Sequence, residues 1–214
     1  MRAFARIDDK DRRRLYRRCG TCEATLLDPA AFLSAAQSRA HYDLHENDVT
    51  DAGYRAFLSK LADPLVARLS PGAIGLDFGC GPGPALAHML CEAGHVVDVY
   101  DPHYRPDRTP LSDAKRYDFI TMTEVAEHLF APHRVFTQLA TLLKPGGLLA
   151  VMTCFQTDDA RFRDWHYRKD PTHVVFYRAR TFEVIAKQCG LTCEIVAKDV
   201  AFLTRPVSGT AWRA

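Results

Sequence analysis

The spacing of apolar residues changes along the chain, and each change predicts a different kind of element. Residues 1–50 contain few periodic apolar runs, so we expect an irregular lead-in there and no core. From Asp51 onward apolar residues recur every three to four positions, the period of an amphipathic helix, until Ser70-Pro71-Gly72 ends it. Pro64 interrupts this helix and is expected to kink it. The apolar positions are Tyr54, Phe57, Leu58, Leu61, Leu65, Val66 and Leu69.

From residue 73 onward, short apolar runs alternate with amphipathic stretches. A strand at 73–78 precedes a helix at 84–93, which has Pro at its start and Gly94 after its end. This alternation predicts an α/β fold with a doubly wound, mostly parallel sheet and helices on both faces. We divide the chain into a lead-in at 1–50 and one domain at 51–214. The other predicted strands are 96–100, 118–123, 148–153, 193–197 and 200–204, and the other helices are 132–143 and 181–188.

Composition and charge narrow the class of protein. The chain has 214 residues, 47% apolar and 25% charged, which is ordinary for a globule with one sizeable core. A net charge of +2 gives no electrostatic case for a nucleic-acid or membrane partner, and a small-molecule partner is favoured. No apolar stretch approaches the roughly 18 residues that span a bilayer. The basic run Arg12, Arg13, Arg14, Arg17 and Arg18 is expected to be a solvated face or tail.

The seven cysteines are an odd number, and no apolar signal segment precedes them. We therefore expect a cytoplasmic protein in a reducing compartment. Cys19-Gly20-Thr21-Cys22 is half of a zinc-ribbon pattern, but no second close pair completes four ligands.

A glycine-rich turn separates the strand at 73–78 from its helix, in the segment GLDFGCGPG at 75–83. Glycines allow a tight turn and close approach of a ligand to the backbone. Asp101 follows Gly81 by twenty residues, at the end of the next strand, where a carboxylate can accept hydrogen bonds from both ribose hydroxyls. Asp77 in the approach is unusual for a pyrophosphate-binding turn and suits a cofactor with a cationic amino-acid end. An adenosine-type cofactor site is predicted, with a purely structural turn as the alternative.

Five motifs over about residues 73–153 resemble the class I S-adenosylmethionine-dependent methyltransferases: LDFGCGPG at 76–83, VYD at 99–101, YDFI at 117–120, EVAEHL at 124–129 and LKPGGLL at 143–149. The EVAEHL element is similar to the small-molecule branch that includes the ubiquinone-pathway O-methyltransferases. The resemblance implies S-adenosylmethionine as cofactor and a Rossmann-like sheet with an antiparallel C-terminal strand. It also implies cofactor contacts by Asp77 and the backbone of Gly79, Cys80, Gly81 and Gly83 around the methionine part, Asp101 on the ribose, and Thr123, Glu124 and Val125 at the sulfonium end.

One stretch departs from the family pattern. Only fifteen residues separate Asp101 from Tyr117, and three of them are Pro102, Pro106 and Pro110. Family members usually place a helix and a further strand there. We expect that helix to be missing or reduced to a turn, which leaves the family's acidic adenine contact unplaced, with Asp113 as a candidate.

Methyl transfer from a sulfonium needs alignment and, for a hydroxyl acceptor, removal of a proton. Glu127 and His128 lie just beyond the carboxyl end of a predicted strand, where ligands bind in open α/β sheets. A histidine pKa of about 6.5 suits proton removal. Two alternatives stay open: Glu127 pairs locally while His128 packs under the cofactor, or Glu124, Glu127 and His128 hold Mg²⁺ or Zn²⁺. Three ligands on one turn are an incomplete set, so no metal site is predicted.

A second polar and aromatic cluster spans residues 165–177 and can fold over the same edge of the sheet. It resembles the Asp-x-Thr-His element of related small-molecule methyltransferases, and here Asp170 and His173 are expected within hydrogen-bonding reach. His173 is the leading candidate for the base, and a loop that only closes the core is the alternative. Trp165, Tyr167 and Tyr177 are candidate walls of the acceptor pocket.

The polar stretch at 42–47 precedes the first helix and is either a lid or a solvated linker. As a lid it would contact the cofactor through Tyr42, His45 and Asn47.

The pattern thus predicts an enzyme that methylates a small molecule, with oxygen as the favoured atom. The rivals are a non-catalytic module that binds S-adenosylmethionine, which needs no His and carboxylate at the rim, and a nucleotide-dependent oxidoreductase, which Asp77 and the EVAEHL element disfavour.

Overall fold

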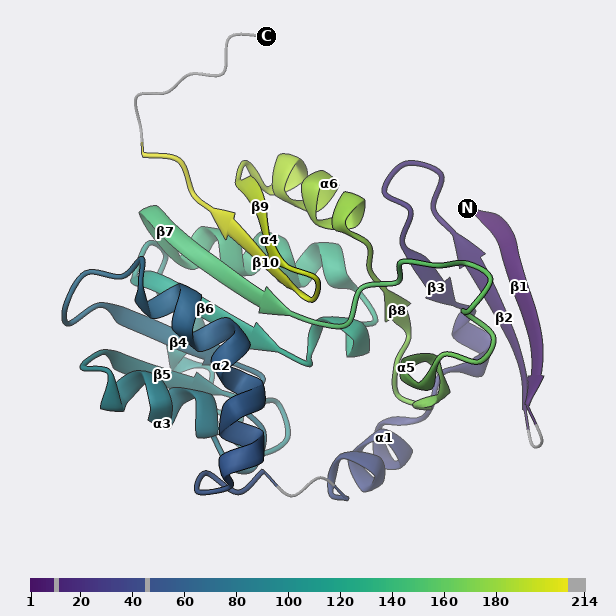
Figure 1. Cartoon of the computed structure of the whole chain (residues 1–214), viewed down its shortest axis with the longest axis horizontal. Helices are drawn as coiled ribbons and strands as arrows, with labels where there is room; N and C mark the ends of the chain where they lie inside the picture. Colours follow the sequence, from purple (N-terminus) through teal and green to yellow (C-terminus); the bar gives the residue numbers. More distant parts are fainter. Residues whose placement is uncertain (10–11, 45–46, 208–214) are drawn as a thin grey trace, which may run out of the picture.

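The computed structural model describes residues 1–9, 12–44 and 47–207, and its strands form two sheets (Figure 1). The larger sheet has the order β5-β4-β6-β7-β10-β9, and the smaller one has the order β1-β2-β3-β8. The larger sheet contains β4 (Ile74–Phe78), β5 (Val96–Tyr100), β6 (Tyr117–Thr123), β7 (Leu143–Met152), β9 (Thr192–Ala197) and β10 (Val200–Thr204). The smaller sheet contains β1 (Arg2–Asp9), β2 (Arg12–Arg18), β3 (Thr25–Leu27) and β8 (Val175–Phe176).

Strands β4, β5, β6 and β7 are parallel, whereas β10 pairs antiparallel with both β7 and β9. The predicted doubly wound sheet with an antiparallel C-terminal strand is confirmed. β4 lies between β5 and β6, so the chain leaves β4 toward one side and later returns on the other. The gap beyond the carboxyl ends of β4 and β6 is therefore the switch point at which open α/β sheets bind ligands.

Helices cover both faces of the larger sheet, because successive strand residues point to opposite sides. Phe119, Ala150 and Phe202 pack with α2 and α3, while their neighbours Ile120 and Val151 pack with α4 and α6. Among the described residues, no helix is both long and apolar enough to cross a bilayer. The α-helices are α1 (Ala35–Tyr42), α2 (Ala52–Val66), α3 (Ala85–Glu92), α4 (Pro132–Leu142), α5 (His166–Lys169) and α6 (Ala179–Cys189), and the 3-10 turns are η1 (Pro29–Ala31), η2 (Thr109–Leu111) and η3 (Ala126–His128).

The connection from β5 to β6 contains only the 3-10 turn η2. The predicted loss of a helix is confirmed, and β5 forms the edge of the sheet. Three prolines explain the loss, because each removes a backbone donor and disfavours helical geometry in the residue before it.

The N-terminal residues contradict the expected irregular lead-in. Strands β1, β2 and β3 form an antiparallel sheet that continues into β8, and Ile7, Tyr16 and Leu27 are buried in the main core. Arginines conceal the alternation in the sequence, since Arg14, Tyr16 and Arg18 all point inward on β2. The prediction of a solvated basic run is therefore wrong for Arg14 and Arg18.

The inward arginine Arg18 is compensated by specific contacts. Its guanidinium donates to Thr25 Oγ1 at 2.8 Å and to Asp159 Oδ1 at 2.7 Å, and it lies 4.1 Å from the centre of the Phe4 ring. These contacts satisfy a buried charge that a hydrophobicity pattern alone does not anticipate.

We expect Tyr16→Ala to lower the free energy of unfolding by about 3–5 kcal/mol, the range for truncating a buried aromatic ring. The Tyr16 ring is 1% exposed and packs edge-on against Phe162 and Phe176. Urea denaturation measures the change, and Arg13→Ala on the exposed side of the same strand serves as the control, with an effect within about 0.5 kcal/mol. An unchanged midpoint for Tyr16→Ala would show that the small sheet does not share the core.

Candidate active site

A cavity of about 860 Å³ lies at the carboxyl ends of the parallel strands, between them and α1. Gly83 is not among its lining residues, and His45 lies outside the described residues. The structure brings the following predicted residues together around this one cavity: Tyr42, Asn47, Asp77, Gly79, Cys80, Gly81, Asp101, Thr123, Glu124, Val125, Glu127, His128, Asp170 and His173.

The turn after β4 requires its glycines for two separate reasons. Gly79 has a φ of 82°, and a Cβ there would lie 2.3 Å from a methyl carbon of Val125. Gly83 sits against the chain at Asn47, where a Cβ would lie 1.9 Å from the Asn47 carbonyl oxygen. The turn therefore packs directly against the segments that line the cavity, with no room for side chains.

Two carboxylates flank this turn. Asp77 is buried, accepts a hydrogen bond from Thr121 Oγ1 at 2.8 Å, and has a pKa raised by burial to about 6. Asp101 accepts hydrogen bonds from the backbone N–H groups of Gly81 at 3.1 Å, His103 at 2.8 Å and Tyr104 at 3.1 Å. Asp101 thus fixes the end of β5 against the glycine turn while facing the cavity.

Glu127 is the centre of the polar cluster at the other end of the cavity. Its side chain is fully buried, and Oε2 accepts a hydrogen bond from Thr153 Oγ1 at 2.9 Å. Thr153 Oγ1 in turn lies 2.9 Å from the Tyr167 hydroxyl. The other oxygen, Oε1, has no hydrogen-bond partner among the described residues and lies 3.9 Å from Nε2 of both His128 and His173.

Backbone carbonyls fix the tautomer and the orientation of both imidazoles. His173 Nδ1 lies 2.7 Å from the Tyr167 carbonyl oxygen, and His128 Nδ1 lies 3.2 Å from that of Thr172. A carbonyl only accepts, so each Nδ1 carries the hydrogen and each neutral ring turns a lone pair at Nε2 toward Glu127. Burial lowers the pKa of His173, and the Glu127 carboxylate opposes that shift. The two Nε2 lone pairs and Glu127 Oε1 repel one another, and a proton or a cation between them relieves this repulsion.

Asp170 does not form the predicted hydrogen bond with His173, because the closest oxygen lies 3.9 Å from Nε2. It accepts instead from the Thr172 backbone N–H at 2.8 Å and lies 3.2 Å from His41 Nε2. Burial raises the pKa of Asp170, but the bonds from Thr172 and the nearby histidines outweigh burial and bring it to about 2.

Two of the three predicted pocket walls are wrong. Tyr167 lines the cavity, whereas Tyr177 is buried in the core with its hydroxyl donating to the Ala126 carbonyl. Trp165 is not a lining residue and packs against Phe162, Phe176 and Tyr167. A core position and a pocket wall both demand aromatic residues, so the sequence pattern does not separate them.

Glu124 does not share a helical turn with Glu127 and His128, because it has a φ of 51° and precedes the 3-10 turn η3. Burial, assisted by Glu127, raises the pKa of Glu124 to about 8, so its carboxyl group is protonated at neutral pH. Among the described residues, the group with the spacing of metal ligands is Glu127, His128 and His173, whose ligand atoms lie within 4.8 Å of one another. The sequence alternative named Glu124, Glu127 and His128 as metal ligands; in the structure His173 replaces Glu124 in that set.

Cys19 and Cys22 are free thiols in the turn between β2 and β3. In the part of the chain that the structure describes, no group of three or more potential ligands includes them.

Helix α1 is the part of the site that the sequence reasoning missed. Ser34 and Gln37 form a capping box at its start, and this Ser-x-x-Gln spacing was the available signal. Arg39 donates to the His103 carbonyl at 3.1 Å, and His41 faces Asp170, so α1 joins the loops after β5 and α5. The cavity is also lined by Ala35 and Ser38 of α1 and by Tyr54 and Phe57 of α2.

The comparisons with known proteins agree with this geometry. The model of a methyltransferase-domain family matches residues 51–196. A ubiquinone biosynthesis O-methyltransferase of Coxiella burnetii is 31% identical over 113 residues, which cover 43% of this chain and 46% of the relative. The aligned part therefore spans less than half the length of the curated relatives that the chain matches.

Two solved structures share the fold. The 1,6-didemethyltoxoflavin-N1-methyltransferase of Burkholderia thailandensis, with its substrate and S-adenosylhomocysteine bound, has a TM-score of 0.56 at 14% identity over 96% of this chain and 100% of its own. A magnesium protoporphyrin IX methyltransferase from Synechocystis PCC 6803, with S-adenosylmethionine bound, has a TM-score of 0.51 at 16% identity over 80% of this chain and 92% of its own.

The fold and the family match together define a methyltransferase domain with the Rossmann-like sheet of class I, as the sequence motifs predicted. The chain belongs to the methyltransferase-domain family whose model covers residues 51–196.

We expect Glu127→Gln to lower the pKa of His173 further, because the nearby carboxylate favours the charged imidazolium. NMR titration of the imidazole signals in metal-free buffer measures this shift. Asp113→Asn, which replaces an exposed carboxylate, is the control and leaves the titration unchanged. A His173 pKa that does not fall in Glu127→Gln would mean that the two groups do not interact.

Proposed function

We propose that the protein transfers the methyl group of S-adenosylmethionine to a hydroxyl oxygen of a small-molecule acceptor. The observation that carries this proposal is the buried Glu127 carboxylate between two imidazoles, in the same cavity as the glycine turn and Asp101. The cofactor and a base for the acceptor then meet in one enclosed space, as an alignment-driven reaction requires. The likeness to an O-methyltransferase supports oxygen as the acceptor atom.

In this proposal the cofactor lies along the carboxyl ends of β4, β5 and β6. Asp77, next to the turn, attracts the ammonium group of the methionine part, and the Gly79–Gly83 backbone surrounds that part. Asp101 binds the ribose hydroxyls, and Thr123 to Val125 lie at the sulfonium. The Tyr42 ring, whose centre is 5.2 Å from that of His128, separates the cofactor from the acceptor.

The affinity for S-adenosylmethionine is expected to fall as the pH is lowered through about 6. Asp77 has a pKa of about 6 and must be ionised to attract the ammonium group, so protonation below that pH removes the attraction. Asp77→Asn should weaken binding by about tenfold or more at pH 8 and abolish the pH step, since a hydrogen bond to a charged group contributes about 1.5–3 kcal/mol.

Calorimetry at several pH values measures this dependence. Asp107→Asn, an exposed carboxylate in the loop before η2, is the control and should retain the step. Affinity that is the same at pH 5 and pH 8 would contradict the role of Asp77.

The reaction needs few groups from the protein. The acceptor hydroxyl donates to Nε2 of His173, because the Tyr167 carbonyl holds the ring hydrogen on Nδ1. As the oxygen attacks the methyl carbon and the neutral thioether leaves, the proton passes to His173, and Glu127 stabilises the imidazolium that forms. His128, from the other side of Glu127, is the second candidate for this role.

We expect His173→Ala to lower kcat by about 10²–10⁴-fold, the range for losing a general base, without changing the affinity for the cofactor. His133→Ala, at an exposed position on α4, is the control. Turnover and calorimetry on the same preparations decide the matter. Normal turnover in both His173→Ala and His128→Ala would show that the acceptor hydroxyl loses its proton to solvent without help from either histidine. A lowered melting temperature alone would make His173 a packing residue.

A divalent cation on the same three side chains is a second candidate, favoured by the unpartnered Oε1 of Glu127 and the two Nε2 atoms turned toward it. One carboxylate and two imidazoles are a donor set that suits Zn²⁺ or another divalent transition metal. Such an ion would lower the pKa of the acceptor hydroxyl. If a chelator abolishes the activity and one metal restores it, the result favours the bound cation. If the activity survives chelation, the result favours proton transfer to the histidine without a metal.

The runner-up is a module that binds the cofactor without catalysis. It would bind S-adenosylmethionine with the pH step described above and transfer no labelled methyl group in a broad metabolite screen.

A further inference from the structure

We propose that the acceptor is an uncharged hydroxyl compound with an apolar body, and that the cavity discriminates against acceptors that carry a carboxylate, phosphate or sulfonate. This inference rests on the proposed function, because it describes the acceptor of the same site. It starts from the charges around the cavity.

The described residues that line the cavity contain carboxyl groups but no lysine or arginine. Cofactor binding uses Asp77 and Asp101 in the proposed arrangement, and Glu124 is protonated at neutral pH, so the carboxylates that remain for the acceptor are those of Glu127 and Asp170. An anionic acceptor would therefore face negative side chains without a cationic partner. The acidic lining residues are Asp77, Asp101, Glu124, Glu127 and Asp170.

Two arginines that adjoin lining residues in the sequence, Arg39 and Arg105, are turned to other partners. Arg39 binds Asp43 at 2.9 Å and the His103 carbonyl, and it stacks on the Tyr104 ring. Arg105 donates to the Tyr104 carbonyl at 3.1 Å.

The buried oxygen of Glu127 makes the discrimination specific to the reacting end. Its Oε1 faces the two imidazoles and has no hydrogen-bond partner among the described residues. Thr153 fixes the other oxygen, so the carboxylate stays in place. This carboxylate repels a second anion a few ångströms away, and we expect the repulsion to weaken the binding of an anionic acceptor by on the order of tenfold or more.

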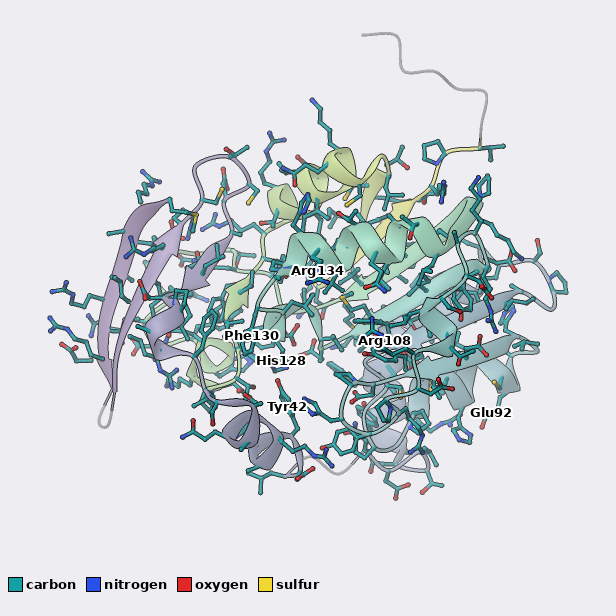
Figure 2. All side chains as sticks on the ribbon, turned by 180° about the vertical axis from the view of Figure 1, so that it is seen from behind. Tyr42, Glu92, Arg108, His128, Phe130 and Arg134 are labelled. Atoms are coloured by element: carbon teal, nitrogen blue, oxygen red, sulfur yellow. The ribbon has the colours of Figure 1, made fainter. Side chains whose placement is uncertain are left out.

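Apolar side chains form the wall next to His128. Leu129 and Phe130 line it from the segment between η3 and α4, Val135 lines it from α4, and Ala35 faces it from α1. Figure 2 shows Phe130, His128 and Tyr42 following one another from this segment toward α1. Phe130 is 59% exposed yet stacks on Phe32 with ring centres 4.8 Å apart, so a flat apolar surface stands at the cavity mouth. It suits a planar, uncharged ring.

Two fluorescent probes test this inference without requiring turnover. N-Phenyl-1-naphthylamine and 1-anilinonaphthalene-8-sulfonate have the same rings and differ by one sulfonate. With saturating S-adenosylhomocysteine present, the uncharged probe should bind at least about tenfold more tightly than the sulfonate. Equal binding, tighter binding of the sulfonate, or no binding of the uncharged probe would overturn the inference.

A charge added at the cavity mouth shows whether the probes bind there. Ala35→Lys places a cation on the lining and should raise sulfonate affinity by about threefold or more, whereas Ala36→Lys, exposed on the same helix but outside the lining, should not. No difference between the two variants would contradict the assignment of this wall to the acceptor.

The inference and the proposed function fail separately. Methyl transfer to anionic acceptors in preference to uncharged ones would disprove the inference and leave the function intact. Discrimination between the probes in a protein that methylates nothing would leave the cavity description intact and disprove the function.

Discussion

The site depends on one buried carboxylate, that of Glu127. Burying an ionised group is costly unless other groups compensate it, and among the described residues only one of its two oxygens has a hydrogen-bond partner. Thr153 donates to one oxygen from the end of β7, and two imidazoles face the other from η3 and from the loop before β8. The Glu127 carbonyl also accepts the Val174 N–H at 2.8 Å, so the loop that carries His173 is tied to the same residue. The segments around this end of the cavity are thereby held in position by contacts to the side chain and the backbone of a single residue.

The small N-terminal sheet contributes to the site because it supports the loop that carries His173. β3 pairs with β8, which begins two residues after His173, and β2 contributes Tyr16 to the core beneath it. The sheet supports the loop from below while α1 covers the cavity from the other side. The positions of His173 and Asp170 therefore depend on residues far away in the sequence.

The strongest signals in the sequence were periodic and local. The apolar runs of β4, β5, β6 and β7 and the amphipathic helices predicted the parallel part of the sheet, and the three prolines after Asp101 predicted the reduced connection. β1 and β2 were missed because inward arginines such as Arg18 break the alternation, and their partners Thr25 and Asp159 come from other segments. The partner of His173 was mispredicted for the same reason. Asp170 is close to His173 in the sequence, but the buried carboxylate that faces the imidazole is that of Glu127, which comes from a distant segment. Contacts between distant segments have no local signature.

The central claim is that one cavity at the carboxyl ends of β4 to β7 binds S-adenosylmethionine through Asp77, the glycine turn and Asp101. Calorimetric titration of the purified protein with S-adenosylmethionine, S-adenosylhomocysteine and NAD tests it most directly. We expect dissociation constants in the micromolar range for the first two and no measurable binding of NAD, because the turn offers a carboxylate where a dinucleotide carries phosphates. Tighter binding of NAD than of S-adenosylmethionine would contradict it.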